Sequence, residues 1–441
     1  MVVGVLWSRT LVGVWWLARL IFMTTTVGAS TGRMPDVGRS REDVLGLLDQ
    51  FASDDLVWRE GRHQGWVYWP GDEALAVIEE AERRFHFTNP LLSRAFPSFV
   101  RIESDLLAMT SDLMGAPGSD GIVTTGGTES NMLAVWTALQ QARRAGSLTS
   151  SPSIVIPFSA HPSFDKAAGH FGCEVVRVPC GPDYAADPVA TEAAITADTI
   201  LLVGSAPNYP HGIVDPVGAL GAIAQEHDLP LHVDACLGGL ILPFIERLER
   251  PVPTWDFRVP GVTSISADLH KHGYSPKGVG VLLVRDPELA AAGEFYFDGW
   301  PNGRYQTMTI TGTRSGSAVA GAWAVLQYLG IEGYLALTDQ VMTYTDRFQA
   351  AINQHEALSL IGAPPSNKFA YTSDTLDIVA IADALEDRGW QIMRQATPEA
   401  IGMQVAAYHD NAIDHYAADL TTAINETLNG RTRSNTQASY N

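Results

Sequence analysis

Short apolar segments alternate with helical stretches through the middle of the chain, and this alternation restricts the possible folds more than any other feature. Helix-like apolar spacing separates the segments, for example over 163–171 and 215–227. Short strands that are apolar on both faces and connected by helices form a mostly parallel sheet covered on both sides. Functional groups are then expected at the carboxyl ends of the strands. The predicted strands cover 154–157, 174–178, 199–204, 231–234, 262–266 and 279–284.

Helical spacing also precedes and follows this α/β region. Amphipathic helices are predicted over 72–87 and 99–114. A mostly apolar helix over 317–329 is followed by an amphipathic one over 331–355. Beyond it, helices and short strands, with 378–381 as a candidate strand, predict a smaller α+β domain.

Composition limits the classes of partner. With 46% hydrophobic and 18% charged residues, the 441-residue chain has the make-up of an ordinary globular protein. The formal net charge of −20 argues against nucleic acid or an anionic membrane as the main partner, but it leaves room for an anionic small molecule. Cys173, Cys180 and Cys236 lack metal-ligand spacing, so no metal site is predicted. Reduced thiols favour a cytoplasmic location.

The first 22 residues are strongly apolar, but Arg9 and Arg19 interrupt them and leave no stretch long enough to span a bilayer. A signal or anchor segment and an interfacial patch are two explanations, so membrane association stays open. The favoured explanation is an upstream translation start ahead of the real one at Met23 or Met34.

A lysine between two histidines follows the predicted strand 262–266. Nearby positive charge and partial burial would lower the pKa of Lys271, which lies between His270 and His272. A neutral amine is the form that makes a Schiff base. A solvated basic turn is the alternative explanation.

Three further features lie upstream, and each has a structural alternative. Gly126 and Gly127, before Thr128 and an apolar helix, favour an anion site or simply a capped helix start. His161 follows a strand and can stack on a planar ring or satisfy a loop. Asp234 ends a buried strand and needs a cationic partner, either a protonated pyridine nitrogen or an arginine.

Together these features are what pyridoxal 5′-phosphate (PLP) requires: an anion cradle, a stacking ring, a carboxylate for the pyridine nitrogen and a Schiff-base lysine. On this basis and by its motifs, the chain from about 66 to 428 resembles the sphingosine-1-phosphate lyase family. That family lies within the group II PLP-dependent decarboxylase superfamily of fold type I. The motifs are GGTES at 126–130, HG at 211–212, HVDACLGG at 232–239, GVTSISAD at 261–268, HK at 270–271, GY at 273–274, PKG at 276–278 and TI at 309–310.

The resemblance implies an α/β fold of the PLP-dependent transferase type I, with a mostly parallel seven-stranded sheet and a small C-terminal α+β domain. It also implies a homodimer with shared active sites. The expected domains are a leader over 1–40, an N-terminal helical segment over 41–115 that contributes to the active site, a large PLP-binding domain over 116–330, a small domain over 331–430 and a polar tail over 431–441.

The resemblance further implies a role for each matched residue. Lys271 binds PLP as a Schiff base, Asp234 pairs with the pyridine nitrogen, and His161 stacks on the ring. The catalytic residues are Lys271, Asp234, Tyr68 and Lys277; the substrate-binding residues are Asn89, Tyr68 and Lys277. The residues implied for the cofactor phosphate are Gly127, Thr128 and His270, with Gly312 and Thr313 from the neighbouring subunit.

The implied reaction is retro-aldol cleavage of the C2–C3 bond of a phosphorylated long-chain base, which gives phosphoethanolamine and a fatty aldehyde. Tyr68 or Lys277, with a lowered pKa, would take the proton of the 3-hydroxyl. The chain departs from the family at Leu92, where the family has histidine, and His86 is a candidate replacement. Asp298 to Tyr305 also diverges, so the substrate stays open.

Two alternatives remain. A PLP-dependent amino-acid decarboxylase would use the same cofactor half of the site, but would need an arginine or histidine for the α-carboxylate. A cofactor-binding partner subunit with little activity is supported only by Leu92.

Overall fold

The computed structural model describes residues 32–434, 436 and 438, so the predictions for the apolar N-terminal segment lie outside the described residues. The chain divides into two compact units, Met1–Val57 and Trp58–Asn441. In the first unit, helix α2 (Arg41–Phe51) begins after Ser40, whose hydroxyl accepts a hydrogen bond from the Asp43 backbone N–H at 3.0 Å. Within the described ranges, no helix is both long enough and apolar enough to cross a membrane.

A seven-stranded sheet forms the centre of the second unit, in the order β1-β7-β6-β5-β4-β2-β3. Strand β7 pairs antiparallel with β6 and β1, whereas the other neighbouring strands pair in parallel. This confirms the predicted mostly parallel α/β class. The strands are β1 (Asp120–Thr124), β2 (Ser153–Pro157), β3 (Glu174–Val178), β4 (Thr199–Ser205), β5 (Leu231–Asp234), β6 (Val262–Ala267) and β7 (Gly280–Val284).

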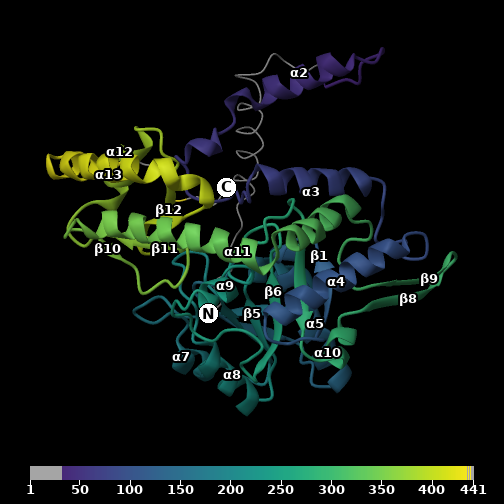
Figure 1. Cartoon of the computed structure of the whole chain (residues 1–441). Coiled ribbons are helices and arrows are strands. Elements are labelled where there is room, and N and C mark those ends of the chain that lie inside the picture. Colours follow the sequence, from purple (N-terminus) through teal and green to yellow (C-terminus); the bar gives the residue numbers. More distant parts are fainter. Residues whose placement is uncertain (1–31, 435, 437, 439–441) are drawn as a thin grey trace. The chain divides into compact units, whose positions relative to one another are not determined.

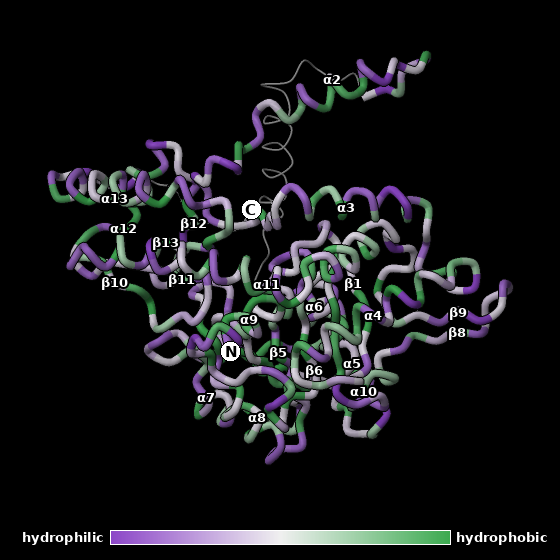
Figure 2. Tube along the Cα trace, in the orientation of Figure 1, coloured by the Kyte–Doolittle hydropathy of each residue, from purple (hydrophilic) through white to green (hydrophobic). Residues whose placement is uncertain are grey.

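Both faces of this sheet are buried because successive side chains of a strand point to opposite sides. In β4, Leu202 packs into one core with helices α4 and α8, whereas Leu201 and Val203 pack into another with α5 and α6. Figure 2 shows hydrophobic residues in the interior around β5. The helices of this region are α3 (Asp72–Arg84), α4 (Pro97–Leu113), α5 (Gly127–Ala145), α6 (Ser163–Phe171), α7 (Pro188–Ala193), α8 (Val217–Glu226), α9 (Leu242–Arg247) and α10 (Pro287–Ala292).

A second sheet, in the order β10-β11-β13-β12, forms a smaller C-terminal domain with its own core. Figure 1 shows helices α12 and α13 beside this sheet. Its elements are β10 (Ser359–Leu360), β11 (Lys368–Thr372), α12 (Ile378–Glu386), β12 (Met393–Ala396), β13 (Glu399–Gln404) and α13 (Ile413–Leu428).

The strand predicted over 378–381 is wrong, because this segment is the first turn of α12. The Asp377 side chain accepts hydrogen bonds from the backbone N–H groups of Val379 and Ala380, at 3.0 and 3.3 Å, and so caps the helix. The helix is buried on nearly all sides. Its short apolar start therefore has the same pattern as a buried strand.

A long helix, α11 (Gly316–Asn353), connects the two domains and is interrupted at Gly330. Gly330 has φ 55° and ψ −173°, which divides α11 into two helices at the predicted position. The first half packs in the core of the large domain, where Val319 lies, and the second half packs in both cores, with Val341 in the large domain and Phe348 in the small one.

A two-stranded hairpin, β8 (Phe295–Trp300) and β9 (Gly303–Thr307), was not predicted from the sequence. The hairpin extends away from the elements around it (Figure 1). Every residue of β8 is exposed, so the strand has none of the alternation between buried and exposed residues by which strands are predicted. Phe295, Tyr296, Phe297 and Trp300 are each about half exposed, at 48–50%.

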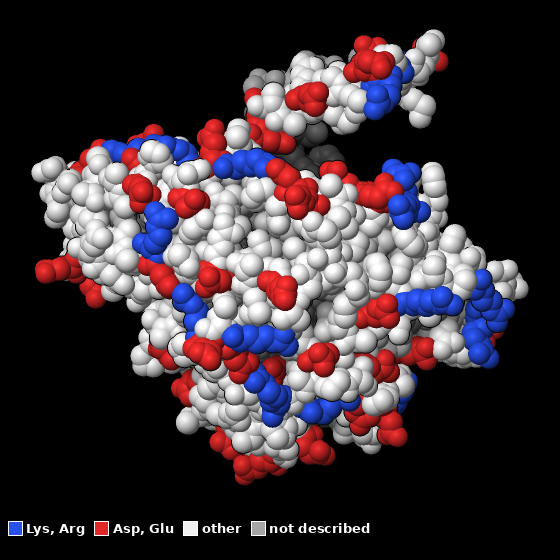
Figure 3. All heavy atoms as spheres, viewed as in Figure 1, with Lys and Arg blue, Asp and Glu red and all other residues white. Residues whose placement is uncertain are grey.

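Charged side chains of both signs are scattered over the face of the molecule in Figure 3, most of which is uncharged. The basic side chains on that face lie among acidic ones.

Gly212 allows the two domains to approach closely. It has φ +77°, and a Cβ atom added there would collide with the backbone carbonyl of Lys368 at the start of β11. The HG motif at 211–212 is thus explained by packing between the domains.

We expect Gly212→Ala to lower the free energy of unfolding by at least about 3 kcal/mol, since a left-handed conformation and a backbone collision combine. Gly172→Ala is the matched control, because Gly172 has φ +73° but nothing lies within 4 Å of an added Cβ. This control pays the conformational cost alone, about 1–2 kcal/mol. Urea denaturation of both variants measures the difference, and equal losses would contradict the packing explanation.

Candidate active site

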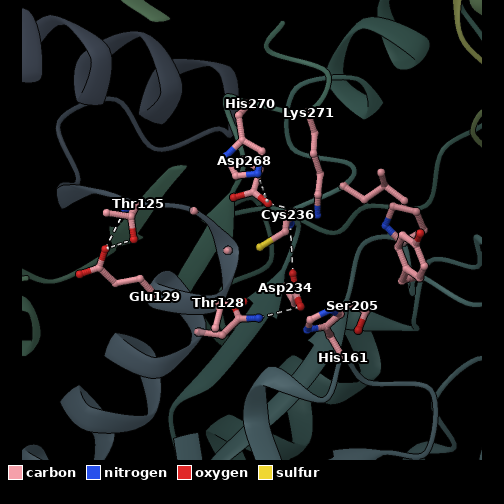
Figure 4. A pocket seen from close by; sticks show the side chains of 16 residues that line it. Thr125, Thr128, Glu129, His161, Ser205, Asp234, Cys236, Asp268, His270 and Lys271 are labelled. Atoms are coloured by element: carbon pink, nitrogen blue, oxygen red, sulfur yellow. Dashed lines mark hydrogen bonds and ion pairs between the residues drawn. The ribbon is translucent and has the colours of Figure 1, made fainter. Parts of the chain in front are cut away.

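One cavity of about 280 Å³ lies at the carboxyl ends of the parallel strands, and all four predicted features meet in it (Figure 4). Its walls come from the β1–α5 loop and from the segments that follow β2, β4, β5 and β6. The lining residues are Thr125, Gly126, Gly127, Thr128, Glu129, Asn131, His161, Ser205, Pro207, Tyr209, Asp234, Cys236, Leu237, Asp268, His270 and Lys271. A topology that joins strand ends from distant parts of the sequence therefore brings these side chains together.

Lys271 extends into the cavity toward Cys236 and Asp234 (Figure 4). Its Nζ atom lies 3.1 Å from Oδ2 of Asp268, a buried carboxylate. Burial disfavours the ammonium, but the charges of Asp268, Cys236, Tyr68 and Asp234 together outweigh it, so the pKa of Lys271 is raised well above its ordinary value. The prediction that flanking histidines depress this pKa is wrong, because Asp268, three residues earlier, controls the charge of the amine.

The two flanking histidines differ in position. The His270 ring lies at the cavity, with Nδ1 2.9 Å from the Val279 carbonyl and Nε2 3.6 Å from Asp268. Burial lowers its pKa. The His272 side chain is instead buried against the ring of Tyr68, with its Nε2 3.2 Å from Nδ2 of Asn367 in the small domain.

Asp234 lies at the end of β5 and is 7% exposed. Its carboxylate accepts hydrogen bonds from the Asn131 side-chain amide at 2.9 Å and from the Cys236 backbone N–H at 3.0 Å. Burial raises the pKa of this carboxyl, but His161, the hydrogen bonds from Cys236 and the charge of Lys271 together hold it below its ordinary value. Asp234 is therefore an anion at neutral pH, as the sequence analysis requires.

A hydrogen-bond network that the sequence analysis did not predict fixes Asp234 and His161. The Asn131 amide donates to Asp234 and, at 2.9 Å, to the Ser163 hydroxyl, which lies 2.9 Å from Nδ1 of His161. The Asn131 carbonyl faces Nε2 of His232 at 3.2 Å. Burial lowers the pKa of His232 to about 4, so its ring is neutral at neutral pH.

The glycines before α5 are required by close packing. Gly126 has φ +131°, and a Cβ atom there would lie 2.7 Å from the His270 ring. A Cβ on Gly127 would collide with Sγ of Cys236 and lie 3.0 Å from Asp268. Both glycines also line the cavity, where the N–H groups and the dipole of the helix start favour an anion.

The donors and acceptors around the cavity fit PLP. A helix N-terminus suits the phosphate, the anionic Asp234 suits a protonated pyridine nitrogen, and the buried Lys271 amine suits the aldehyde. Oδ1 of Asp268 is buried with no hydrogen-bond partner in the described part of the chain, so this oxygen can still accept a hydrogen bond from a bound ligand.

Tyr68 and Lys277 lie close together behind the lysine turn but do not line the cavity. Lys277 Nζ is 4.8 Å from the centre of the Tyr68 ring and donates to the carbonyls of Trp66 and His270, both at 3.1 Å. The Tyr68 hydroxyl accepts a hydrogen bond from Gln404 at 2.6 Å. Burial, with the charge of Lys271, lowers the pKa of Lys277 to about 8.

Asn89, Gly312 and Thr313 lie together outside this cavity. The Asn89 side-chain amide donates to the Thr313 hydroxyl at 3.3 Å, and its carbonyl accepts from the Leu91 backbone N–H at 3.1 Å. Within a single chain, these three residues therefore do not lie at the cavity that contains Lys271. Leu92 is 51% exposed and His86 packs on the ring of Phe87, so neither lines this cavity.

Several lining residues carried no predicted role: Asn131, Ser205, Tyr209, Cys236 and Asp268. Two of them follow the strand pattern, since Ser205 ends β4 and Asp268 directly follows β6. Because functional groups gather at the carboxyl ends of parallel strands, the position of these two residues was a signal from which they could have been predicted. Tyr209 lies further along the loop after β4, where the sequence gives no direction for the side chain.

The comparisons with known proteins agree with this geometry. Residues 88–367 match the pyridoxal-dependent decarboxylase conserved domain. The chain is 36% identical over 410 residues to the sphingosine-1-phosphate lyase of Oryza sativa subsp. japonica, which covers 91% of this chain and 76% of that protein. It is 33% identical to the L-aspartate/L-glutamate decarboxylase of Pyrococcus horikoshii, over 82% of this chain and 91% of that protein.

Among solved structures, the sphingosine-1-phosphate lyase of Burkholderia pseudomallei superposes with a TM-score of 0.87 at 38% identity. The match covers 91% of this chain and 94% of that chain. Fold, cavity and matches thus define a PLP-dependent lyase of fold type I, related to the group II decarboxylases. Within this class, the chain belongs to the sphingosine-1-phosphate lyase family.

Proposed function

We propose that the protein cleaves a phosphorylated long-chain base of the sphingosine-1-phosphate type between C2 and C3, to phosphoethanolamine and a fatty aldehyde. One observation carries the proposal: Lys271, Asp234, His161 and the glycine loop surround one cavity in a chain whose relatives are lyases of that name. PLP supplies an electron sink for the pair released when the C2–C3 bond breaks.

Each group of this chain has a specific task in holding the cofactor. Gly127, Thr128 and His270 hold the phosphate, His161 lies over the ring, and Asp234 keeps the ring nitrogen protonated. The supporting observation for Asp234 is its burial together with two hydrogen bonds from Asn131 and Cys236.

The reaction needs two proton transfers. The 3-hydroxyl must lose a proton as its C–O bond becomes the aldehyde carbonyl, and C2 must gain one when phosphoethanolamine forms. Tyr68 is the proposed acceptor of the first proton, because Lys277 faces its ring and would stabilise a phenolate. Lys271 is the proposed donor of the second, because its side chain extends into the cavity.

An amino-acid decarboxylase is the second candidate, supported by the 33% identity to the archaeal decarboxylase. A substrate α-carboxylate is best held by a bidentate arginine. Among the described residues that line the cavity, none is an arginine, and its two histidines, His161 and His270, have proposed roles toward the cofactor. The lining thus favours the aldolase reaction.

We also propose that two copies of the chain share their active sites. Gly312 and Thr313 lie too far from their own cavity to line it, and Asn89 is hydrogen-bonded to Thr313. In this proposal all three residues serve the cavity of the neighbouring subunit, where Asn89 contacts the substrate and the other two contact the cofactor phosphate.

The test is incubation of the purified protein and PLP with sphingosine-1-phosphate and, separately, with a panel of amino acids. Release of a fatty aldehyde from the lipid supports the proposal. Release of carbon dioxide from an amino acid, without aldehyde from the lipid, supports the decarboxylase instead. Size measurement of the loaded protein shows whether it is a dimer.

The pKa of Lys277 predicts the pH dependence of kcat/KM. If the Lys277 ammonium binds the substrate phosphate, kcat/KM falls as the pH rises through about 8, because the amine loses its charge there. Lys277→Met should remove this descending limb, and Lys277→Arg should keep high kcat/KM to higher pH. A limb that instead ascends through pH 8 in the unmodified enzyme would identify Lys277 as a base and contradict phosphate binding.

A further inference from the structure

Glu129 is a buried carboxylate in the first turn of α5 that the proposed mechanism does not use. Its side chain points toward Thr125 and not toward Lys271 or Asp234 (Figure 4). Oε2 accepts hydrogen bonds from both the backbone N–H and the hydroxyl of Thr125, each at 2.7 Å. Glu129 therefore holds the start of the cofactor loop, residues 125–128.

The other carboxylate oxygen binds a segment distant in the sequence. Oε1 accepts hydrogen bonds from the backbone N–H groups of Ile310 at 2.8 Å and Thr311 at 3.4 Å. These residues belong to the strap, defined here as residues 309–313 between β9 and α11, which carries Gly312 and Thr313.

The strap is also anchored at its far end. The Arg314 guanidinium donates to the Val123 carbonyl in β1 at 2.7 Å and pairs with Glu103 of α4 at 2.7 Å. The strap is thus held by two charged side chains, Glu129 and Arg314. Of these two, only Glu129 also binds the cofactor loop.

We propose that Glu129 is a positioning residue that holds two sets of cofactor-phosphate contacts in place at once. It fixes the loop 125–128 toward the cavity of its own chain and the strap toward the cavity of the neighbouring subunit. The second half rests on the proposed sharing of active sites. The Glu129 carboxylate accepts hydrogen bonds at both oxygens. Because Glu129 is only 6% exposed, water has little access to take over these hydrogen bonds when the carboxylate is removed.

The first test is the affinity for PLP of Glu129→Gln, measured from the visible absorbance of the lysine-bound cofactor. A glutamine accepts at one oxygen only, so its amide nitrogen faces N–H donors and leaves them buried without acceptors. We expect the dissociation constant to rise about tenfold or more. Glu226→Gln, on the exposed surface of α8, is the control and should bind as the unmodified protein does.

A milder variant keeps the proposal testable if Glu129→Gln does not fold. Thr125→Val removes the hydroxyl donor but leaves the carboxylate and the backbone donor, so we expect a rise of about two- to fivefold. A dissociation constant within twofold of the unmodified value in both variants would overturn the proposal.

The second test separates the loop from the strap with mixed dimers, in which only the intact Lys271 site gives the absorbance. Pairing a Glu129→Gln chain with a Lys271→Ala chain disturbs the loop of the intact site. Pairing a Glu129→Gln/Lys271→Ala chain with an unmodified chain disturbs only the strap that reaches the intact site.

We expect weaker PLP binding in both mixed dimers than in the dimer of an unmodified chain with Lys271→Ala. A loss confined to the first mixed dimer would overturn the strap half of the proposal. The lipid-cleavage assay on the unmodified enzyme reports the proposed reaction independently, so failure of one proposal is distinguishable from failure of the other.

Discussion

Replacing Lys271 by alanine is expected to abolish the visible absorbance of the lysine-bound cofactor and to lower turnover by at least about 10³-fold. Lys271 places a primary amine at the centre of the cavity, and in the described part of the chain no other lysine lines it. Absorbance spectra of the variant with added PLP, together with steady-state kinetics, measure both effects.

Two controls separate the loss of the amine from a loss of structure. Lys166→Ala, at an exposed position in α6, should keep both the absorbance and the turnover. Since Asp268 loses its cation in Lys271→Ala, thermal unfolding must show that the variant still folds. Partial recovery of turnover with an added small amine would support the chemical role, and full absorbance in the variant would contradict it.

Replacing Asp234 by asparagine is expected to lower kcat about 10²- to 10³-fold with a much smaller effect on KM. The anion stabilises the protonated ring nitrogen most when electrons flow into the ring, so its loss affects the reacting state more than substrate binding. An asparagine amide would also face the donating amide of Asn131. Steady-state kinetics with the accepted substrate measure the two constants.

Asp383→Asn is the matched control, because Asp383 is a carboxylate of similar exposure, 8%, which pairs with Arg394 in the small domain. This variant should unfold at lower temperature but keep kcat. If Asp234→Asn changed KM and kcat by equal factors, or if Asp383→Asn lowered kcat as much, the electronic role of Asp234 would be wrong.

Much of the fold was predictable because the central strands are buried on both faces. Their short apolar runs, with helices between them, admit few arrangements other than a parallel sheet. The prediction failed where burial and secondary structure are not linked, as in α12, which is buried nearly all round, and in the hairpin β8–β9, which is exposed throughout.

The candidate site was predictable to the extent that its residues follow strands. Lys271 and His161 follow predicted strands, Asp234 ends one, and the structure brings all three into one cavity. The charge of Lys271 was mispredicted from the flanking histidines, because the contact of its amine with Asp268 and the nearby groups on other segments follow only from the folded structure. Likewise, nothing in the sequence indicates that the carboxylate of Glu129 binds a segment about 180 residues later.

The departures of this chain from its family lie close together in space. Leu92 follows shortly after Asn89, which is hydrogen-bonded to Thr313. The Tyr305 hydroxyl of the hairpin would lie 3.3 Å from a Cβ atom added to Gly312. None of these residues lines the cavity around Lys271. In the proposed function, the groups that would select a substrate therefore lie apart in the chain from Lys271 and Asp234. Mutation of these groups is then expected to change the choice of lipid while leaving the residues around Lys271 in place.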